Sequence, residues 1–206
     1  LPERLSTDLC SLRENQLRPC LAVRMTINAQ GRRLGHQFHR GLMRSAAKLS
    51  YQQAQAAFDG VVEADLAALD KPVLQPLWQA YQLMAEAREA RGPLNINRPE
   101  RRVELNDDGQ IARIYIPPRL EAHRLIEEAM LAANVCSADF IQQGKHPGLF
   151  RVHEGPTAEK KDILRNYLKA LGLGMGISDD PHTSEFQKIA QATKDRPDAQ
   201  QIHTML

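Results

Sequence analysis

The chain has 206 residues, with 27 lysines and arginines against 25 aspartates and glutamates, so its net charge is +2. This length fits about one domain of the usual size, roughly 100–200 residues. The apolar fraction of 42% is close to the globular norm of about 45–50%, which argues against an intrinsically disordered chain. No run approaches the roughly 18 apolar residues that a membrane span needs, so no membrane segment is expected. A charge of +2 does not by itself indicate nucleic-acid binding.

The first predicted element is a β-hairpin. Residues 21–28 alternate apolar and polar side chains, Ala29-Gln30-Gly31 forms a turn, and residues 33–40 return as a second strand. Helices are predicted next over residues 51–59 and 61–69, separated by Gly60, and then over residues 73–91, where Gly92-Pro93 ends the helix.

A second hairpin and the best-defined helix follow. Residues 102–105 and 111–116 flank Asn106-Asp107-Asp108-Gly109, a strong turn signal. Residues 119–143 contain neither glycine nor proline and predict one long helix. At 100° per residue its apolar stripe consists of Leu125, Ala129, Ala132, Cys136 and Phe140. The opposite face carries His123, Glu127 and Asn134.

The last third of the chain predicts a short strand and three helices. The strand is expected at residues 149–152, and Thr157 is the expected N-cap of a helix that runs to Leu171, with Gly172 after it. Residues 172–183 predict a loop, and two helices are expected at 184–193 and 197–206. This order indicates an α+β (mixed α/β) fold in which antiparallel hairpins pack with several helices. Each hairpin lacks a sequence partner nearby, and we expect both to belong to a larger sheet.

Local motifs for chemistry are weak. The three cysteines are odd in number and far apart, which is typical of a reducing compartment and predicts a cytoplasmic location. The spacing of Cys10 and Cys20 to His36 and His39 does not fit a zinc site. The glycines at 172–176 follow a predicted helix, so they indicate a loop rather than a phosphate-binding turn. Acidic pairs at 107–108, 127–128 and 179–180 lack the density that metal-dependent phosphodiester chemistry requires. The basic clusters could neutralise phosphates, but they are more typical of a solvated surface in a chain with 25% charged residues.

Five blocks, in order, resemble the ribonuclease II / ribonuclease R family. They are residues 1–12 (LPERLSTDLCSL), 45–51 (SAAKLSY), 126–134 (IEEAMLAAN), 149–156 (LFRVHEGP) and 195–199 (DRPDA). The resemblance implies a processive exoribonuclease that hydrolyses single-stranded RNA from its 3′ end to nucleoside monophosphates, with Mg²⁺ held by an Asp-rich block. That block and a later arginine-bearing block do not occur in residues 1–206. We therefore expect residues 1–206 to be the middle portion of such an RNB-type catalytic domain, inactive alone and binding no Mg²⁺ itself.

Two rival hypotheses remain. The first is a non-catalytic RNA-binding or scaffold module derived from the same family. The second is an unrelated helical interaction domain, which only the helix content favours and the ordered blocks oppose. The sequence leaves the oligomeric state open.

The resemblance also assigns candidate RNA-binding residues. Tyr51 and Glu127 match a family pair that contacts ribose near the RNA 3′ end and favours RNA over DNA. Without the resemblance, Tyr51 is better explained as a half-buried residue at a helix start, and Glu127 as a solvated carboxylate. Asn134 either supports this site or makes a hydrogen bond at the rim of the core. Arg151 and His153 would share one face of a strand, either as a channel wall or as an exposed surface. Ile96 stands where family members often place a residue that stacks on a base, so an aromatic clamp is not expected there.

Overall fold

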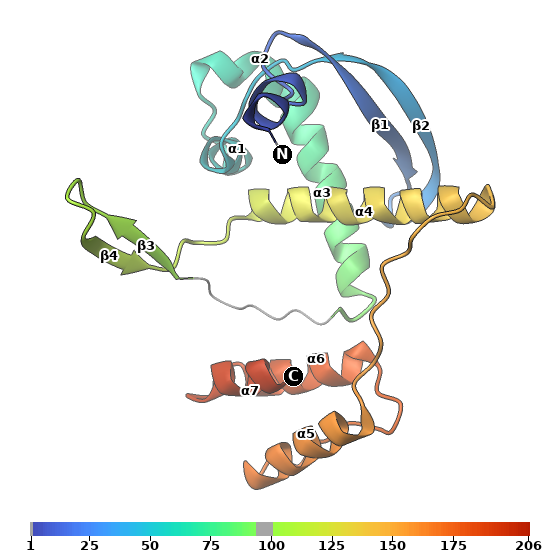
Figure 1. The fold of residues 1–206 in the computed structure, drawn as a ribbon, viewed down its shortest axis with the longest axis vertical. Coiled ribbons are helices and arrows are strands. Elements are labelled where there is room, and N and C mark those ends of the chain that lie inside the picture. Colours follow the sequence, from blue (N-terminus) through green and yellow to red (C-terminus); the bar gives the residue numbers. More distant parts are fainter. Residues whose placement is uncertain (1, 94–100) are drawn as a thin grey trace. The chain divides into compact units, whose positions relative to one another are not determined.

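The computed structural model describes residues 2–93 and 101–206 (Figure 1). The chain divides into two compact units, and each is described by itself. The first unit holds Leu1–Ala87 and Arg119–Leu149, and the second holds Arg88–Pro118 and Phe150–Leu206. Within the described ranges no helix is both long and apolar enough to cross a membrane.

The first unit combines a hairpin with helices. A π-helical turn at Leu5–Leu9 precedes strands β1 (Leu17–Ile27) and β2 (Arg33–Arg44). Helix α1 (Tyr51–Phe58) is followed by a 3-10 turn (Ala64–Leu66), α2 (Ala67–Leu69), a π-helical turn (Asp70–Leu74) and α3 (Gln75–Glu89). Helix α4 (Glu121–Gln143) completes the unit.

The predicted first hairpin is confirmed, with longer strands than expected. Strands β1 and β2 pair antiparallel, with Leu21 opposite Arg40. The turn needs a glycine at position 31: its φ is +67°, and a Cβ there would lie 2.0 Å from the Leu83 carbonyl oxygen of α3. The tip of the hairpin therefore packs directly on α3. Several leucines of the strands remain exposed, among them Leu21 at 71% and Leu42 at 68%.

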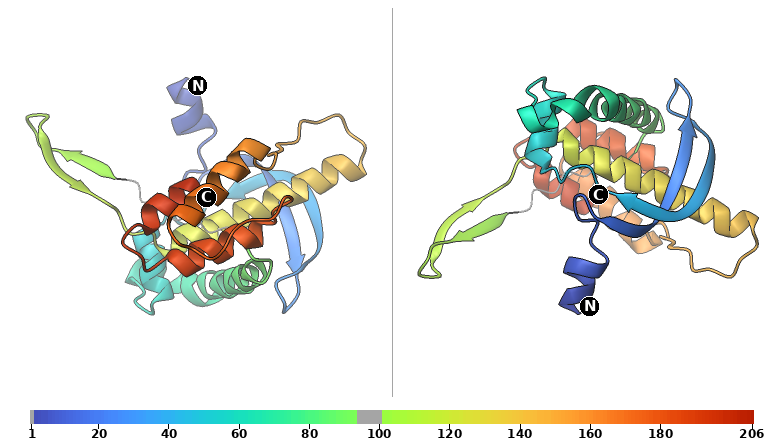
Figure 2. Two further views of the ribbon diagram at one scale, coloured as in Figure 1. Left: turned by 90° about the horizontal axis from the view of Figure 1, so that it is seen from below. Right: turned by 90° about the horizontal axis from the view of Figure 1, so that it is seen from above.

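Helix α4 buries the face that its sequence predicts. Leu125 and Cys136 are buried, whereas Asn134, on the opposite face, is exposed. Phe140 differs from the prediction, because half of its surface is exposed while its ring packs edge-on against Phe38 of β2, with centroids 5.1 Å apart. Arg33 of β2 also forms an ion pair with Asp139. The curved β1–β2 ribbon therefore lies against the C-terminal half of α4 (Figure 2).

The second unit contains a small hairpin and three helices. Strands β3 (Arg102–Leu105) and β4 (Ile111–Tyr115) pair antiparallel, as predicted. Helix α5 (Ala158–Ala170) has the predicted N-cap, since the Thr157 hydroxyl accepts a hydrogen bond from the Lys160 N–H at 3.3 Å. Helices α6 (Thr183–Thr193) and α7 (Ala199–Met205) follow. The buried core of these helices consists of Leu164, Leu168, Ile177, Phe186, Ile189 and Ile202.

Three local predictions differ from the structure. Residues 149–152 are not a strand, because no strand of the described chain pairs with them, and Leu149 and Val152 are exposed. The helix expected at 61–69 begins only at 64, after Gly60 with φ +90° and an extended stretch. The helix expected to begin at residue 73 starts at Gln75, directly after the π-helical turn. That turn contains Pro72, a residue without a backbone N–H.

Each hairpin forms its own two-stranded sheet among the described residues, so the larger sheet stays a prediction.

The Glu185 carboxylate links the loop before α6 to the first turn of that helix through hydrogen bonds. One carboxylate oxygen accepts from the Ser178 N–H at 2.8 Å, and the other accepts from the Ser178 hydroxyl at 2.9 Å and the His182 N–H at 3.0 Å. The Ser178 N–H, followed by the other two donors, lowers the pKa of the Glu185 carboxyl from its ordinary value.

We expect Glu185→Gln to lower the thermal unfolding midpoint at pH 7, because these donors favour the charged carboxylate. A carboxyl with a lowered pKa in the folded state stabilises the fold above its unfolded pKa of about 4.3, and this contribution is lost as pH falls through the folded value. The difference between wild type and variant should therefore close below about pH 4. Glu159→Gln, at an exposed carboxylate in the first turn of α5, is the matched control. A constant gap across the acid range would contradict the assignment.

Candidate functional site

The first turn of α4 is where three helices of the first unit meet. Its N-cap is Leu120, whose side chain cannot accept a hydrogen bond, so other groups must satisfy the free N–H donors of the turn. The Leu120 N–H donates to His123 Nδ1 at 3.1 Å, and the Ala122 N–H donates to Gln55 Oε1 of α1 at 3.0 Å. From α3, the Tyr81 hydroxyl donates to Glu121 Oε2 at 2.6 Å.

Tyr51 lies at this junction. It is the first residue of α1, and Ser50 before it forms a capping box: its hydroxyl accepts from the Gln53 N–H at 3.2 Å, and its own N–H donates to Gln53 Oε1 at 3.0 Å. The Tyr51 ring stacks on His123 of α4, with centroids 4.0 Å apart and planes 19° from parallel. Tyr51 remains 42% exposed, so one side of this stacked pair is accessible to a ligand.

Glu127 lies on the same face of α4, one turn after His123. Residues four apart on a helix are neighbours, with Cβ atoms roughly 5–6 Å apart. Glu127 forms an ion pair with Arg119, which precedes the helix, and both side chains are partly exposed. Asn134 is exposed two turns further along the same face. Tyr51 and Glu127 are thus linked through His123, which stacks on the Tyr51 ring and lies one turn before Glu127 on the same face of α4, and Asn134 lies two turns beyond Glu127.

These residues present hydrogen-bonding groups of complementary kinds. The Tyr51 phenol can donate or accept, the Glu127 carboxylate accepts, and the Arg119 guanidinium donates. Sequence reasoning missed the roles of Arg119 and His123. For His123 the available signal was its four-residue spacing to Glu127, since it places both on one helical face. Arg119 precedes the helix, and no such spacing indicates its contact with Glu127.

Arg151 and His153 belong to the second unit. The expected strand does not form, so the argument that alternation points both side chains to one face is wrong. Both residues are exposed in the extended segment between α4 and α5, and His153 Nδ1 lies 2.9 Å from the Glu154 carbonyl oxygen. Because a carbonyl only accepts, this contact places the proton on Nδ1.

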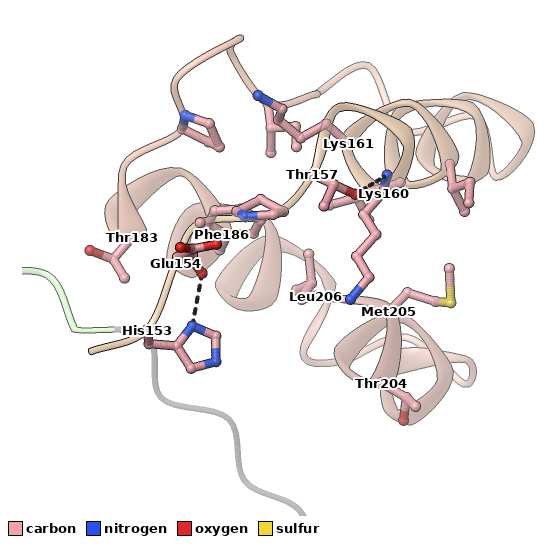
Figure 3. Close-up of a pocket in the computed structure, with 16 residues that line it drawn as sticks. His153, Glu154, Thr157, Lys160, Lys161, Thr183, Phe186, Thr204, Met205 and Leu206 are labelled. Carbon is pink, nitrogen blue, oxygen red and sulfur yellow. Dashed lines mark hydrogen bonds between the residues drawn. The ribbon is translucent and has the colours of Figure 1, made fainter. Parts of the chain in front are cut away.

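The second unit also contains a pocket of about 780 Å³ beside His153 (Figure 3). It lies between the 153–157 segment, α5, α6 and the end of α7. Its wall is largely apolar and includes Phe186, Met205 and Leu206, whereas Lys160 and Lys161 supply positive charge. It holds none of the other candidate residues.

The described residues offer no metal site. Nowhere in 2–93 and 101–206 do three His, Cys, Asp or Glu side chains gather as a metal would require. Asp107 and Asp108 lie in the turn of the β3–β4 hairpin, and Asp179 forms an ion pair with Arg165. The glycines at 172–176 follow α5 and form a loop. Ile96 lies outside the described residues.

Comparison with known proteins identifies the family. The sequence model of the RNB domain matches residues 1–206, and the chain therefore belongs to the RNB domain family. Among curated relatives, Ribonuclease R of Escherichia coli is 35% identical over 209 residues, which cover 100% of this chain and 26% of that protein. Exoribonuclease 2 of Escherichia coli is 32% identical over 205 residues, covering 96% of this chain and 31% of that protein. The chain thus spans about a quarter of the length of the relatives it matches first.

Solved structures show the same fold. RNase R of Mycoplasma genitalium, in complex with ribose methylated single-stranded RNA, superimposes with a TM-score of 0.90 at 22% identity, covering 100% of this chain and 32% of that one. The complex of the same enzyme with double-stranded RNA gives a TM-score of 0.91. These matches confirm the predicted mixed fold of helices and antiparallel hairpins, and the family model confirms the predicted resemblance.

Gln55→Ala should destabilise the first unit by about 1 kcal/mol, because the Ala122 N–H at the start of α4 loses its acceptor. Denaturant unfolding followed by circular dichroism measures this change. Gln52→Ala, at an exposed position of the same helix, is the control and should leave stability nearly unchanged. Equal effects of the two substitutions would show that the link between α1 and α4 contributes nothing.

Proposed function

We propose that residues 1–206 are the middle portion of the catalytic domain of a longer cytoplasmic exoribonuclease. The complete enzyme would hydrolyse single-stranded RNA from its 3′ end and release nucleoside monophosphates. The observation that carries this proposal is the match of the RNB domain model along the whole chain, together with relatives named Ribonuclease R and Exoribonuclease 2.

The Mg²⁺ ions of such an enzyme would be held elsewhere in the longer protein. The described residues do not fit a magnesium site, because they bring no cluster of three potential ligands together. Metal ions about 4 Å apart in two-metal nucleases need several converging carboxylates. In this proposal the present chain therefore contributes RNA contacts, and the acidic block supplies the metal site.

The proposed RNA contacts centre on ribose. The 2′-hydroxyl of RNA is both a donor and an acceptor, and it is the group that distinguishes RNA from DNA. In this proposal it donates to the Glu127 carboxylate and accepts from the Tyr51 phenol, and the stack of Tyr51 on His123, one helical turn before Glu127, supports the pairing of these two residues. Asn134 would extend this site, and Arg151 and His153 would contact phosphate from the exposed segment before α5.

The isolated chain is expected to be inactive. Incubation of residues 1–206 with oligo(A) and Mg²⁺ should release no mononucleotides above background, whereas the full-length protein should degrade the same substrate. Product release is measured by chromatography. Robust release by the isolated chain would contradict the proposal that this chain contributes RNA contacts while an acidic block elsewhere supplies the metal site. A full-length protein that binds RNA without degrading it would instead favour a non-catalytic RNA-binding module.

In the full-length protein, Glu127→Ala should reduce the preference for RNA over DNA ends by about tenfold or more, the usual effect of losing a hydrogen bond to a charged group. Tyr51→Ala should reduce it by about twofold to tenfold, because its hydrogen bond to the 2′-hydroxyl joins two neutral groups. The measurement is the ratio of degradation rates for matched oligonucleotides with ribose or deoxyribose at the 3′ end. Glu104→Ala is the control for Glu127, since Glu104 is also an exposed carboxylate in an ion pair, with Arg113. Variants that keep the wild-type ratio would refute the ribose assignment.

A further inference from the structure

We propose that His123 is a positioning residue that holds the Tyr51 ring in place and thereby sets the preference for ribose. This inference rests on the proposed contact of Tyr51 with the 2′-hydroxyl. His123 itself need not touch the RNA, because it acts through the stacked ring. Neither the match to the family nor the sequence pattern assigns it this role.

The need for such a residue follows from where Tyr51 lies. As the first residue of α1, it has no preceding helical turn against which its side chain can pack. With 42% of its surface exposed, the ring would otherwise exchange between rotamers. The nearly parallel stack on His123, at 4.0 Å between centroids, is the contact that selects one orientation and fixes where the phenol oxygen lies.

His123 can serve as this platform because its own ring is fixed. Its Nδ1 accepts the Leu120 N–H at 3.1 Å, so the neutral ring carries its proton on Nε2. The backbone at the start of α4 therefore sets the plane of the imidazole. The adjacent bond from the Ala122 N–H to Gln55 ties α1, and with it Tyr51, to the same turn.

The position of His123 along α4 connects the stack to the second ribose contact. His123 and Glu127 are four residues apart within α4, which places them on one helical face, and Arg119, which precedes the helix, forms an ion pair with Glu127. The imidazole thus lies one helical turn before Glu127 on the same face of α4. A shift of the Tyr51 ring would change the separation of its phenol from Glu127, and the pair would no longer match one 2′-hydroxyl.

His123 combines a ring and a hydrogen-bond acceptor, and two substitutions separate these properties. His123→Gln keeps an acceptor for the Leu120 N–H, since glutamine at this helix position forms a capping box, but it removes the ring. His123→Phe keeps a ring that can stack on Tyr51 but removes the acceptor. A structural role in capping α4 predicts that Phe is the harmful change, whereas a positioning role predicts that Gln is.

The test uses the full-length protein and the ratio of degradation rates on RNA ends with ribose or 2′-deoxyribose. We expect His123→Gln to lower this ratio by roughly threefold to tenfold, the amount that corresponds to losing one stacked aromatic pair. Its thermal unfolding midpoint should stay close to wild type. His123→Phe should keep most of the ratio and show the lower midpoint.

Each other outcome overturns the inference in a recognisable way. A wild-type ratio in His123→Gln, with a lowered ratio in Tyr51→Ala, would refute the positioning role and leave the proposed function intact. Equal slowing on both substrates in His123→Gln would show that the residue is merely structural. A wild-type ratio in Tyr51→Ala would remove the proposed ribose contact itself, and the role of His123 with it.

Discussion

The first unit depends on how the free backbone N–H groups at the start of α4 find acceptors. Because Leu120 has no side-chain acceptor, this turn relies on His123 from its own sequence and on Gln55 from α1. Tyr81 of α3 adds a hydrogen bond to Glu121, and burial together with this bond raises the pKa of its phenol, so it remains a donor. The hydrogen bonds at the start of α4 therefore also orient α1 and α3. The geometry around Tyr51, the first residue of α1, follows from the same contacts.

Local signals predicted much of the fold. The glycine- and proline-free segment before Gly144 gave α4 and its buried face, and Thr157 marked the start of α5. Features that depend on contacts between residues far apart in the sequence could not be predicted. The bond between Gln55 and Ala122 joins residues 67 positions apart, and nothing in either neighbourhood indicates it. Residues 150–153 alternate apolar and polar side chains like a strand, but a strand also needs a neighbour to pair with, and alternation cannot reveal whether one exists.

The candidate site, like the fold, could be predicted only in part from the sequence. Tyr51 and Glu127 came from the resemblance of two sequence blocks to a known family, since an exposed tyrosine and an exposed glutamate carry no signal of their own. Only the structure shows that the Tyr51 ring stacks on His123, which lies one turn before Glu127 on α4. Net charge was uninformative for a related reason: the chain spans about a quarter of the length of the relatives it matches first, and a segment need not share the charge balance of a full-length relative.

The β1–β2 ribbon influences whether copies of the chain associate through their strand edges. A two-stranded ribbon has unpaired backbone groups along both outer edges, and its exposed leucines would favour lateral addition of another strand. The two strands carry arginines, two in β1 and three in β2, and neither contains an aspartate or glutamate. Asp8 pairs with Arg18 and Asp139 pairs with Arg33, so these two charges are compensated. Copies that approach edge to edge still bring together the positive charges of Arg24, Arg40 and Arg44. Electrostatic repulsion protects these open edges, so salt, which screens that repulsion, weakens the protection.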